Sequence, residues 1–213
     1  MKRLGLVVAI MLVASVAQAQ PITSFDNLDF DSGGVTTPGP FKGFDAPDAP
    51  EIAGWTNYPA GALNDAGVEG PGAWWGPYDV NAGFMSGGDA AYTMSTYTIQ
   101  PGDIYQIGFV AKQWNWTGAV GEWTATLFYD DPANVIGSFV QTDLPDGWTA
   151  FSSAGIPATP ASVGGTLGIL MTSSGSRISQ VDEITVSVVP EPATICLVGF
   201  CVAGLMFFRR EVR

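Results

Sequence analysis

The sequence predicts an all-β domain, an antiparallel two-sheet β-sandwich of the jelly-roll type, between two apolar terminal segments. Three observations lead to this fold class. Glycine and proline, 27 and 15 residues, recur throughout the chain. No stretch of the central region repeats apolar residues at the i, i+3, i+4, i+7 spacing of a helix. Short runs rich in β-branched and aromatic residues follow one another at spacings of about eight to fifteen residues, as in sandwiches and barrels.

The first segment, residues 1–19, has the features of a secretory signal peptide. Lys2 and Arg3 precede an apolar run over 4–16. Ala17-Gln18-Ala19 then supplies the small-x-small pattern that a signal peptidase accepts, which favours a cleaved signal over a retained membrane helix. We therefore expect a mature chain that begins near Gln20 and folds outside the cytoplasm.

The next seventy residues are irregular. SFDNLDFDSGG, residues 24–34, has the composition of an opening strand, and we expect one there. The stretches 41–58 and 64–84 read as long loops, which in a compact domain usually carry function or wrap a sheet edge.

Seven later runs predict strands from their β-branched and aromatic content. Residues 130–134, DDPAN, predict a hairpin-like connection, and Pro101-Gly102 a turn. In the run 103–114, every second residue is apolar, which predicts a core-facing side formed by Tyr105, Ile107, Phe109 and Ala111. The predicted strands span residues 90–99, 103–114, 122–131, 134–144, 148–156, 166–173 and 182–189.

The last segment is a short apolar stretch that starts after two prolines and ends in arginines. Residues 195–208 form a helix of about 21 Å at most, which is short for the ~30 Å hydrocarbon core of a bilayer. Pro190 and Pro192 stop the helix from extending backwards. Arg209, Arg210 and Arg213 would stay on the cytoplasmic side. The segment is thus expected to hold the chain in a membrane only weakly.

Pro190-Glu191-Pro192, the apolar helix and the basic end together resemble the PEP-CTERM sorting signal of Gram-negative bacteria, over residues 189–213. The resemblance implies an exosortase, a membrane transpeptidase, as partner. It implies transient anchoring in the inner membrane, processing near the motif, and delivery to the cell surface or the exterior. Cys196 and Cys201 lie within the apolar stretch and are expected to pack there as small apolar residues.

Residues 20–188 remain as a domain large enough for a full core. Residues 20–189 contain no Cys and no His, and three basic residues (Lys42, Lys112, Arg177) face eighteen acidic ones, a net charge of −15. This balance argues against nucleic-acid and anionic-lipid partners, because both require clustered Lys or Arg. The aromatic content argues against disorder. Without disulfides, the exported domain must be held by packing, or by packing and a metal ion.

The opening DNLDFDSGG, Gly54-Trp55 and the closing strand VDEITVSV resemble galactose-binding-like and carbohydrate-binding-module jelly rolls. In such domains a structural calcium often joins the first and last strands. The resemblance therefore implies Asp31 and Asp182 as calcium ligands, and hard oxygen donors suit Ca²⁺. The alternative is that both are solvated carboxylates at strand ends.

Four tryptophans are candidate glycan-stacking residues. Trp74 and Trp75 lie in the Gly/Pro-rich run GPGAWWGPY, and Trp114 and Trp116 would share one face of an extended strand. Rigid planar rings stack on the apolar faces of sugars at low entropic cost. The alternative for each is a place in the core.

Catalysis has little support, and we expect no enzyme. A serine nucleophile needs a histidine base, which the chain lacks. A glycosidase with two carboxylates stays open as an alternative, with Glu69 and Glu122 as examples of many possible pairs. We expect an exported structural or glycan-binding component of an extracellular polysaccharide matrix, as in a biofilm. A membrane-anchored surface scaffold without sugar binding is a further alternative.

Overall fold

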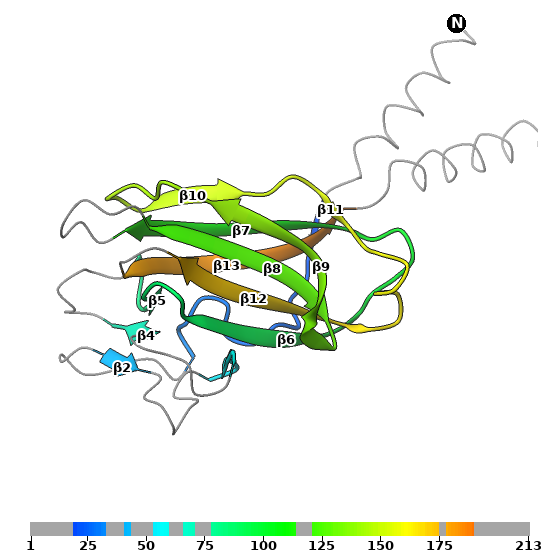
Figure 1. Cartoon of the computed structure of the whole chain (residues 1–213), viewed down its shortest axis with the longest axis horizontal. Helices are drawn as coiled ribbons and strands as arrows, with labels where there is room; N and C mark the ends of the chain where they lie inside the picture. The colour runs from blue at the N-terminus through cyan, green and yellow to red at the C-terminus, as the bar shows by residue number, and fades with distance from the viewer. Residues whose placement is uncertain are drawn as a thin grey trace, which may run out of the picture.

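The computed structural model describes residues 19–32, 41–43, 53–59, 66–70, 78–113, 121–174 and 178–189, those at 41–43 by backbone only. Within these ranges every element is a strand, and the strands form two sheets in which all pairs are antiparallel (Figure 1). The all-β sandwich predicted from the sequence is confirmed. The predicted terminal segments, including the apolar helix at 195–208, lie outside the described residues.

The eight-stranded sheet has the order β10-β7-β13-β5-β4-β2, with β1 paired to β13 and β11 paired to β7. Its strands are β1 (Gln20–Pro21), β2 (Phe41–Gly43), β4 (Ala66–Glu69), β5 (Ala82–Met85), β7 (Ile104–Gln113), β10 (Thr149–Ser152), β11 (Ile156–Pro157) and β13 (Ser179–Val189).

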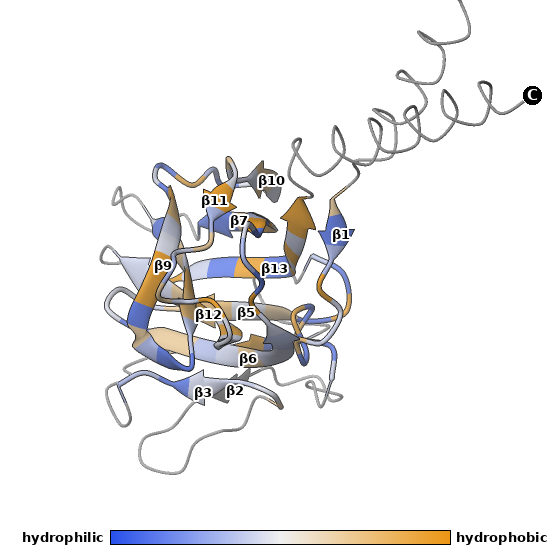
Figure 2. Cartoon of the chain, turned by 90° about the vertical axis from the view of Figure 1, so that its right-hand side faces the viewer, coloured by the Kyte–Doolittle hydropathy of each residue, from blue (hydrophilic) through white to orange (hydrophobic). Residues whose placement is uncertain are grey.

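The five-stranded sheet has the order β3-β6-β12-β8-β9. Its strands are β3 (Thr56–Asn57), β6 (Ala90–Thr98), β8 (Glu122–Tyr129), β9 (Asp131–Gln141) and β12 (Thr166–Ser174). At one side of the sandwich β11 packs onto β9 (Figure 2): a Cβ added at Gly137 would lie 2.7 Å from Ile156 Cγ2. This contact closes one edge between the two sheets.

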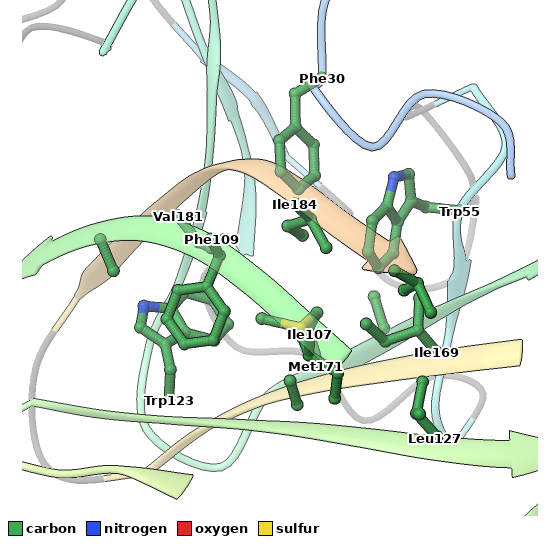
Figure 3. Packing of buried hydrophobic residues seen from close by; sticks show 14 of the residues in the cluster. Phe30, Trp55, Ile107, Phe109, Trp123, Leu127, Ile169, Met171, Val181 and Ile184 are labelled. Carbon is green, nitrogen blue, oxygen red and sulfur yellow. The ribbon is translucent and has the colours of Figure 1, made fainter. Parts of the chain in front are cut away.

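The core lies between the sheets and follows the period-two pattern of the strands. The predicted inner face of β7, Tyr105, Ile107, Phe109 and Ala111, is buried as expected. From the other sheet, alternate residues of β8 and β12 point inward to meet it (Figure 3). These are Trp123, Ala125, Leu127, Leu167, Ile169 and Met171, all fully buried.

The predicted opening strand at 24–34 is wrong for its described part. Residues 22–32 form turns and bends after the short β1. Asn27 and Phe30 have φ angles of 54° and 58°, in the left-handed region, which interrupts an extended conformation. The turns bring Phe30 inward, where its ring stacks on Trp55 at a centroid distance of 5.2 Å (Figure 3).

The same segment is tied to its neighbours by hydrogen bonds. Asn27 O accepts a bond from Trp55 Nε1 at 2.9 Å, and Asn27 Nδ2 donates to Ala53 O at 2.9 Å. Ile184 N of the last strand donates to Leu28 O at 3.2 Å. These bonds hold the N-terminal turns against Trp55 and the last strand, with Phe30 buried in the core.

Other parts of the prediction also differ from the structure. The stretches 41–58 and 64–84, expected to be long loops, contain the short strands β2, β3 and β4 and most of β5, and the strand expected at 134–144 is β9 at Asp131–Gln141. The connection expected at 130–134 is only Asp130, whose φ of 59° turns the chain directly into β9. The strand expected at 148–156 is divided into β10 and β11. An Asp residue in the left-handed φ region reverses the chain within fewer residues than the composition of the segment predicts.

The contact between Gly83 and Phe30 gives a stability prediction. A Cβ at Gly83 would lie 2.6 Å from Phe30 Cζ. Gly83→Ala should therefore lower the free energy of unfolding by about 1–3 kcal/mol, the usual cost of overpacking. Gly147→Ala is the control, because a Cβ there meets nothing within 4 Å. Urea unfolding of the mature protein measures both, and equal stability of the two variants would contradict the packing described.

Candidate functional site

The outward side of the five-stranded sheet presents a row of aligned side chains. Thr56, Tyr92, Leu170, Thr126 and Ser138 are direct cross-strand partners, one on each strand from β3 to β9. Directly opposed residues point to the same side of a sheet. Their chain neighbours, such as Ala91, Ile169 and Ala125, belong to the core, so this row faces outward.

Two further rows flank the first. One contains Ala90, Thr172, Thr124 and Val140, and the other contains Met94, Gly168, Phe128 and Val135. We call the three rows together the five-stranded face. Most of its side chains are half-buried or exposed, and Val135 and Val140 are 53% and 50% exposed.

Aromatic rings form the centre of the five-stranded face. Tyr92 meets Phe128 edge to face at 5.7 Å and Tyr58 at 6.3 Å. Phe128 lies across Gly168, since a Cβ at that glycine would fall 2.2 Å from Phe128 Cζ. The buried Phe128 ring therefore supports Tyr92, which is itself half-buried.

The five-stranded face is uncharged within the described residues of its three rows. Two carboxylates lie at its margins, Glu122 beyond Thr124 and Asp130 beyond Phe128; Glu122 accepts a hydrogen bond from Ser174 Oγ at 2.7 Å. Hydroxyl groups are frequent instead, and Thr126 Oγ1 and Ser138 Oγ lie 2.8 Å apart. Aromatic edges beside hydroxyls suit a ligand that is both apolar and rich in hydroxyl groups.

A second feature is a carboxylate cluster where the N-terminal turns meet the last strand. Asp182 is buried, and its Oδ1 accepts a bond from Glu183 N at 2.7 Å, while its Oδ2 has no partner. Asp31 Oδ1 accepts from Asn81 Nδ2 at 3.2 Å, and Asn81 Oδ1 is buried without a partner. Two acceptor oxygens are thus unsatisfied beside Asp31.

The electrostatics of this cluster are unfavourable without a cation. Burial raises the pKa of Asp182 to about 7; the hydrogen bond from Glu183 N opposes this, and the carboxylates of Glu183, Asp31 and Asp29 add to it. Among the described residues, no three His, Cys, Asp or Glu side chains are grouped to hold a metal by themselves. A hard cation here would need the amide of Asn81 and backbone carbonyls as well, which Ca²⁺ accepts.

The other predicted site residues fall into two groups. Glu69 is buried on the outer side of the eight-stranded sheet, whereas Glu122 belongs to the five-stranded sheet, so the two carboxylates are not brought together. The second group lies outside the described residues. It comprises Trp74, Trp75, Trp114, Trp116, Pro190, Glu191 and Pro192.

Sequence reasoning missed the five-stranded face. Its signal was present as alternation: Thr124 and Thr126 alternate with Trp123 and Ala125, so that hydroxyls occupy one side of the predicted strand. What the sequence did not show is which strands stand beside this one.

Residues 188–210 match the model described as the PEP-CTERM protein-sorting motif. The chain carries a PEP-CTERM sorting motif. This match agrees with the resemblance seen in Pro190-Glu191-Pro192 and its apolar continuation. No curated protein matches the chain.

The sandwich is similar to solved structures of carbohydrate-binding modules and of glycosidase chains. An arabinose-bound GH51 α-L-arabinofuranosidase matches at TM-score 0.50 and 14% identity, covering 79% of this chain and 26% of that chain. A structure titled CBM4 structure and function matches at TM-score 0.48 and 14% identity, covering 78% and 99%.

The CBM22-1–GH10 modules of a Clostridium thermocellum xylanase, complexed with xylohexaose, match at TM-score 0.45 and 18% identity, covering 65% of this chain and 26% of that chain. The chain thus spans about a quarter of the enzyme chains that it matches. At 14% identity, the match to the arabinofuranosidase chain supports the β-sandwich fold of this chain and nothing further.

In the part of the chain that the structure describes, no helix is long and apolar enough to cross a membrane.

Proposed function

We propose that this protein is a carbohydrate-binding surface protein that holds neutral, hydroxyl-rich glycan chains on the five-stranded face. The observation that carries the proposal is an uncharged face of aromatic and hydroxyl side chains in a domain with a net charge of −15. Sugar C–H faces pack on Tyr92 and Leu170, and the hydroxyls of Thr124 and Thr172 are placed to bond sugar hydroxyls. The similarity of the fold to carbohydrate-binding modules supports this proposal.

In this proposal the protein binds the glycan and does not hydrolyse its glycosidic bonds. Cleavage of a glycosidic bond requires two carboxyl groups about 5 to 9 Å apart on either side of the bond. On the five-stranded face, Glu122 begins β8 and Asp130 follows its last residue, so at about 3.3 Å per residue these two carboxylates are too far apart to form such a pair. A bound glycan would therefore contact aromatic and hydroxyl groups without a pair of carboxyl groups across one glycosidic bond.

The sorting motif supports export of this domain from the cytoplasm. A PEP-CTERM motif implies export and transient anchoring in the membrane, with an exosortase as the processing partner. The apolar tail then holds the protein temporarily in the membrane, and the exosortase recognises the motif. We further propose a Gram-negative host and a role as a structural component of the extracellular polysaccharide matrix, since a glycan-binding domain released at the surface would lie within that matrix.

We also propose that Ca²⁺ binds the carboxylate cluster. Asp31 and Asp182 would hold it together with Asn81, whose unsatisfied oxygen fits a hard cation. Bound there, the ion would supply positive charge that offsets the mutual repulsion of the carboxylates. It would thereby link the N-terminal turns to the last strand.

The binding face is tested by truncating its central ring. Tyr92→Ala should weaken binding of neutral polysaccharides by about tenfold or more, because each 1.4 kcal/mol is a factor of ten and an aromatic contact is of this size. Tyr78→Ala is the matched control: Tyr78 is 49% exposed and packs on Trp148, beside the other sheet. Affinity electrophoresis on neutral and anionic polysaccharides measures both variants.

Loss of binding in Tyr92→Ala alone supports the five-stranded face. Loss in Trp74→Ala with Tyr92→Ala unaffected would move the site to the predicted tryptophans. A wild-type protein that binds no polysaccharide would reject the proposal.

The sorting motif is tested through processing. Glu191→Ala should leave a membrane-retained form of higher mass, because the exosortase no longer recognises the motif. Immunoblots of membrane and medium fractions measure this, with Glu211→Ala in the terminal basic region as control. Normal release of Glu191→Ala would contradict sorting by this motif.

The calcium proposal predicts a thermal shift. At a free Ca²⁺ concentration about 100 times the dissociation constant, binding should stabilise the fold by about 2.7 kcal/mol. Asp182→Asn should abolish this gain, whereas Asp143→Asn, at an exposed turn, should retain it. Differential scanning calorimetry with Ca²⁺ and with a chelator makes the comparison. A melting temperature that is insensitive to Ca²⁺ in the wild type would refute the site.

A further inference from the structure

A buried polar cluster lies on the outer side of the eight-stranded sheet, away from the five-stranded face. Lys112 of β7 stands directly opposite Gln180 of β13, and Gln180 stands opposite Phe84 of β5. Glu69 of β4 lies on the same side, two residues beyond Gly67, the partner of Phe84. Opposed residues on one side have Cβ atoms about 4.5–5.5 Å apart. The amine and the amide therefore lie on the adjacent strands β7 and β13, and the Glu69 carboxyl group reaches the amide from β4, across β5.

The three groups are removed from water and held in place. Glu69 and Gln180 are 0% exposed and Lys112 is 9% exposed. Gln180 Nε2 donates a hydrogen bond to Glu69 Oε1. Lys112 Nζ lies 4.8 Å from the ring centroid of Trp148, which covers the amine from the side of β10. The backbone carbonyl of Gln180 accepts a bond from Trp123 Nε1 at 3.2 Å, which fixes the residue from inside the core.

Burial at this site destabilises the charged forms of the acid and the amine. Desolvation raises the pKa of Glu69 to about 7, although the charge of Lys112 opposes this. Desolvation lowers the pKa of Lys112, against the opposing effect of Glu69. Passing one proton from Lys112 to Glu69 gives a neutral amine and a carboxylic acid. A neutral buried lysine is a nucleophile, and a buried carboxylic acid is a proton donor.

Two acceptor oxygens of the cluster have no hydrogen-bond partner, Glu69 Oε2 and Gln180 Oε1. An amide turned by 180° exchanges its oxygen and nitrogen positions at little steric cost. In that orientation the protonated Glu69 donates to Gln180 Oε1 and polarises the amide carbonyl toward attack. The cluster thus combines a nucleophile, an electrophile and a proton carrier in a site without bulk water, the arrangement that acyl transfer requires.

We propose that Lys112 and Gln180 become joined by an intramolecular isopeptide bond, with Glu69 as the proton carrier. The lone pair of Lys112 Nζ attacks Gln180 Cδ to form the Nζ–Cδ bond. The Cδ–Nε2 bond then breaks, and Nε2 leaves as ammonia. Glu69 gives its proton to the leaving nitrogen and receives one from Nζ, so that it ends as it began. One amide replaces another, and no oxidant or cofactor is consumed.

Such a bond would join β7 to the strand that leads into the sorting segment. β13 ends at Val189, and Pro190 of the motif is the next residue. Any pull through the C-terminal tail would therefore act on β13 first. Both cysteines of the chain, Cys196 and Cys201, follow the motif, so residues 20–189 contain no disulfide to resist such a pull. An amide bond needs no oxidising environment.

Peptide mapping of the native, exported protein tests the bond directly. Digestion with trypsin and chymotrypsin should yield a branched peptide that joins the segments containing Lys112 and Gln180. The intact domain should be about 17 Da lighter than its sequence, the mass of one ammonia. Cyclisation of an N-terminal Gln20 gives the same mass loss, so the fragment spectrum that locates the branch decides the result.

Three variants sharpen the test. Lys112→Arg should be folded and lack the branched peptide, because a guanidinium stays protonated and does not attack. Glu69→Gln should leave Lys112 and Gln180 unlinked, which separates the proton carrier from a merely structural neighbour. Lys42→Arg, a control in β2, should keep the link.

Three results would each contradict a different part of the proposal. Unlinked Lys112 and Gln180 in the wild-type digest would overturn the proposal even if every variant failed to fold. A loss of about 18 Da, the mass of water, with a branch at Glu69 would overturn the assignment of Gln180 as the electrophile. A link that persists in Glu69→Gln would overturn the role of Glu69.

Discussion

The antiparallel pairing of β7 with β13 is the constraint on which the rest of the structure depends. The ladder runs from Ser179 opposite Gln113 to Val189 opposite Ile104, with a register shift between Asp182 and Thr185. On its other side β13 pairs with β1 and β5, so the last strand joins the N-terminal segment to the body of the sheet. A slip of one residue would turn the inward side chains of β13 out of the core.

This ladder also decides which polar groups share the outer side of its sheet. The core side of β7 is fixed by Tyr105, Ile107 and Phe109, so Lys112 must point outward, and the register sets it against Gln180. The register shift begins at Asp182, where Glu183 adopts a φ of 50°. That turn carries the Asp182 carboxylate toward the N-terminal turns. The polar cluster and the carboxylate cluster are therefore two consequences of one strand pairing.

The two outer sides of the sandwich differ in chemistry because they differ in burial. The five-stranded face is mostly half-exposed, and its polar groups are hydroxyls, which lose little when water is replaced by another hydroxyl. The eight-stranded sheet keeps Glu69, Gln180 and Asp182 fully buried, where an unpaired charge is costly and reactivity is altered. The first side suits the glycan binding proposed for it. The second side suits the cross-link and the Ca²⁺ site proposed there.

The sequence alone determined the elements with a strict local signal. The alternation in 103–114 fixed the core side of β7, and the Pro-Glu-Pro tail fixed the sorting motif, because both are read from neighbouring residues. The opening strand at 24–34 was wrong because Asn27 and Phe30 take left-handed conformations that composition does not reveal. The four predicted tryptophans lie outside the described residues and stay predictions. Only the tertiary structure decided that Tyr92 meets Phe128 and that Lys112 faces Gln180. Such pairs join strands that are distant in the sequence, and their register depends on the packing of the whole core.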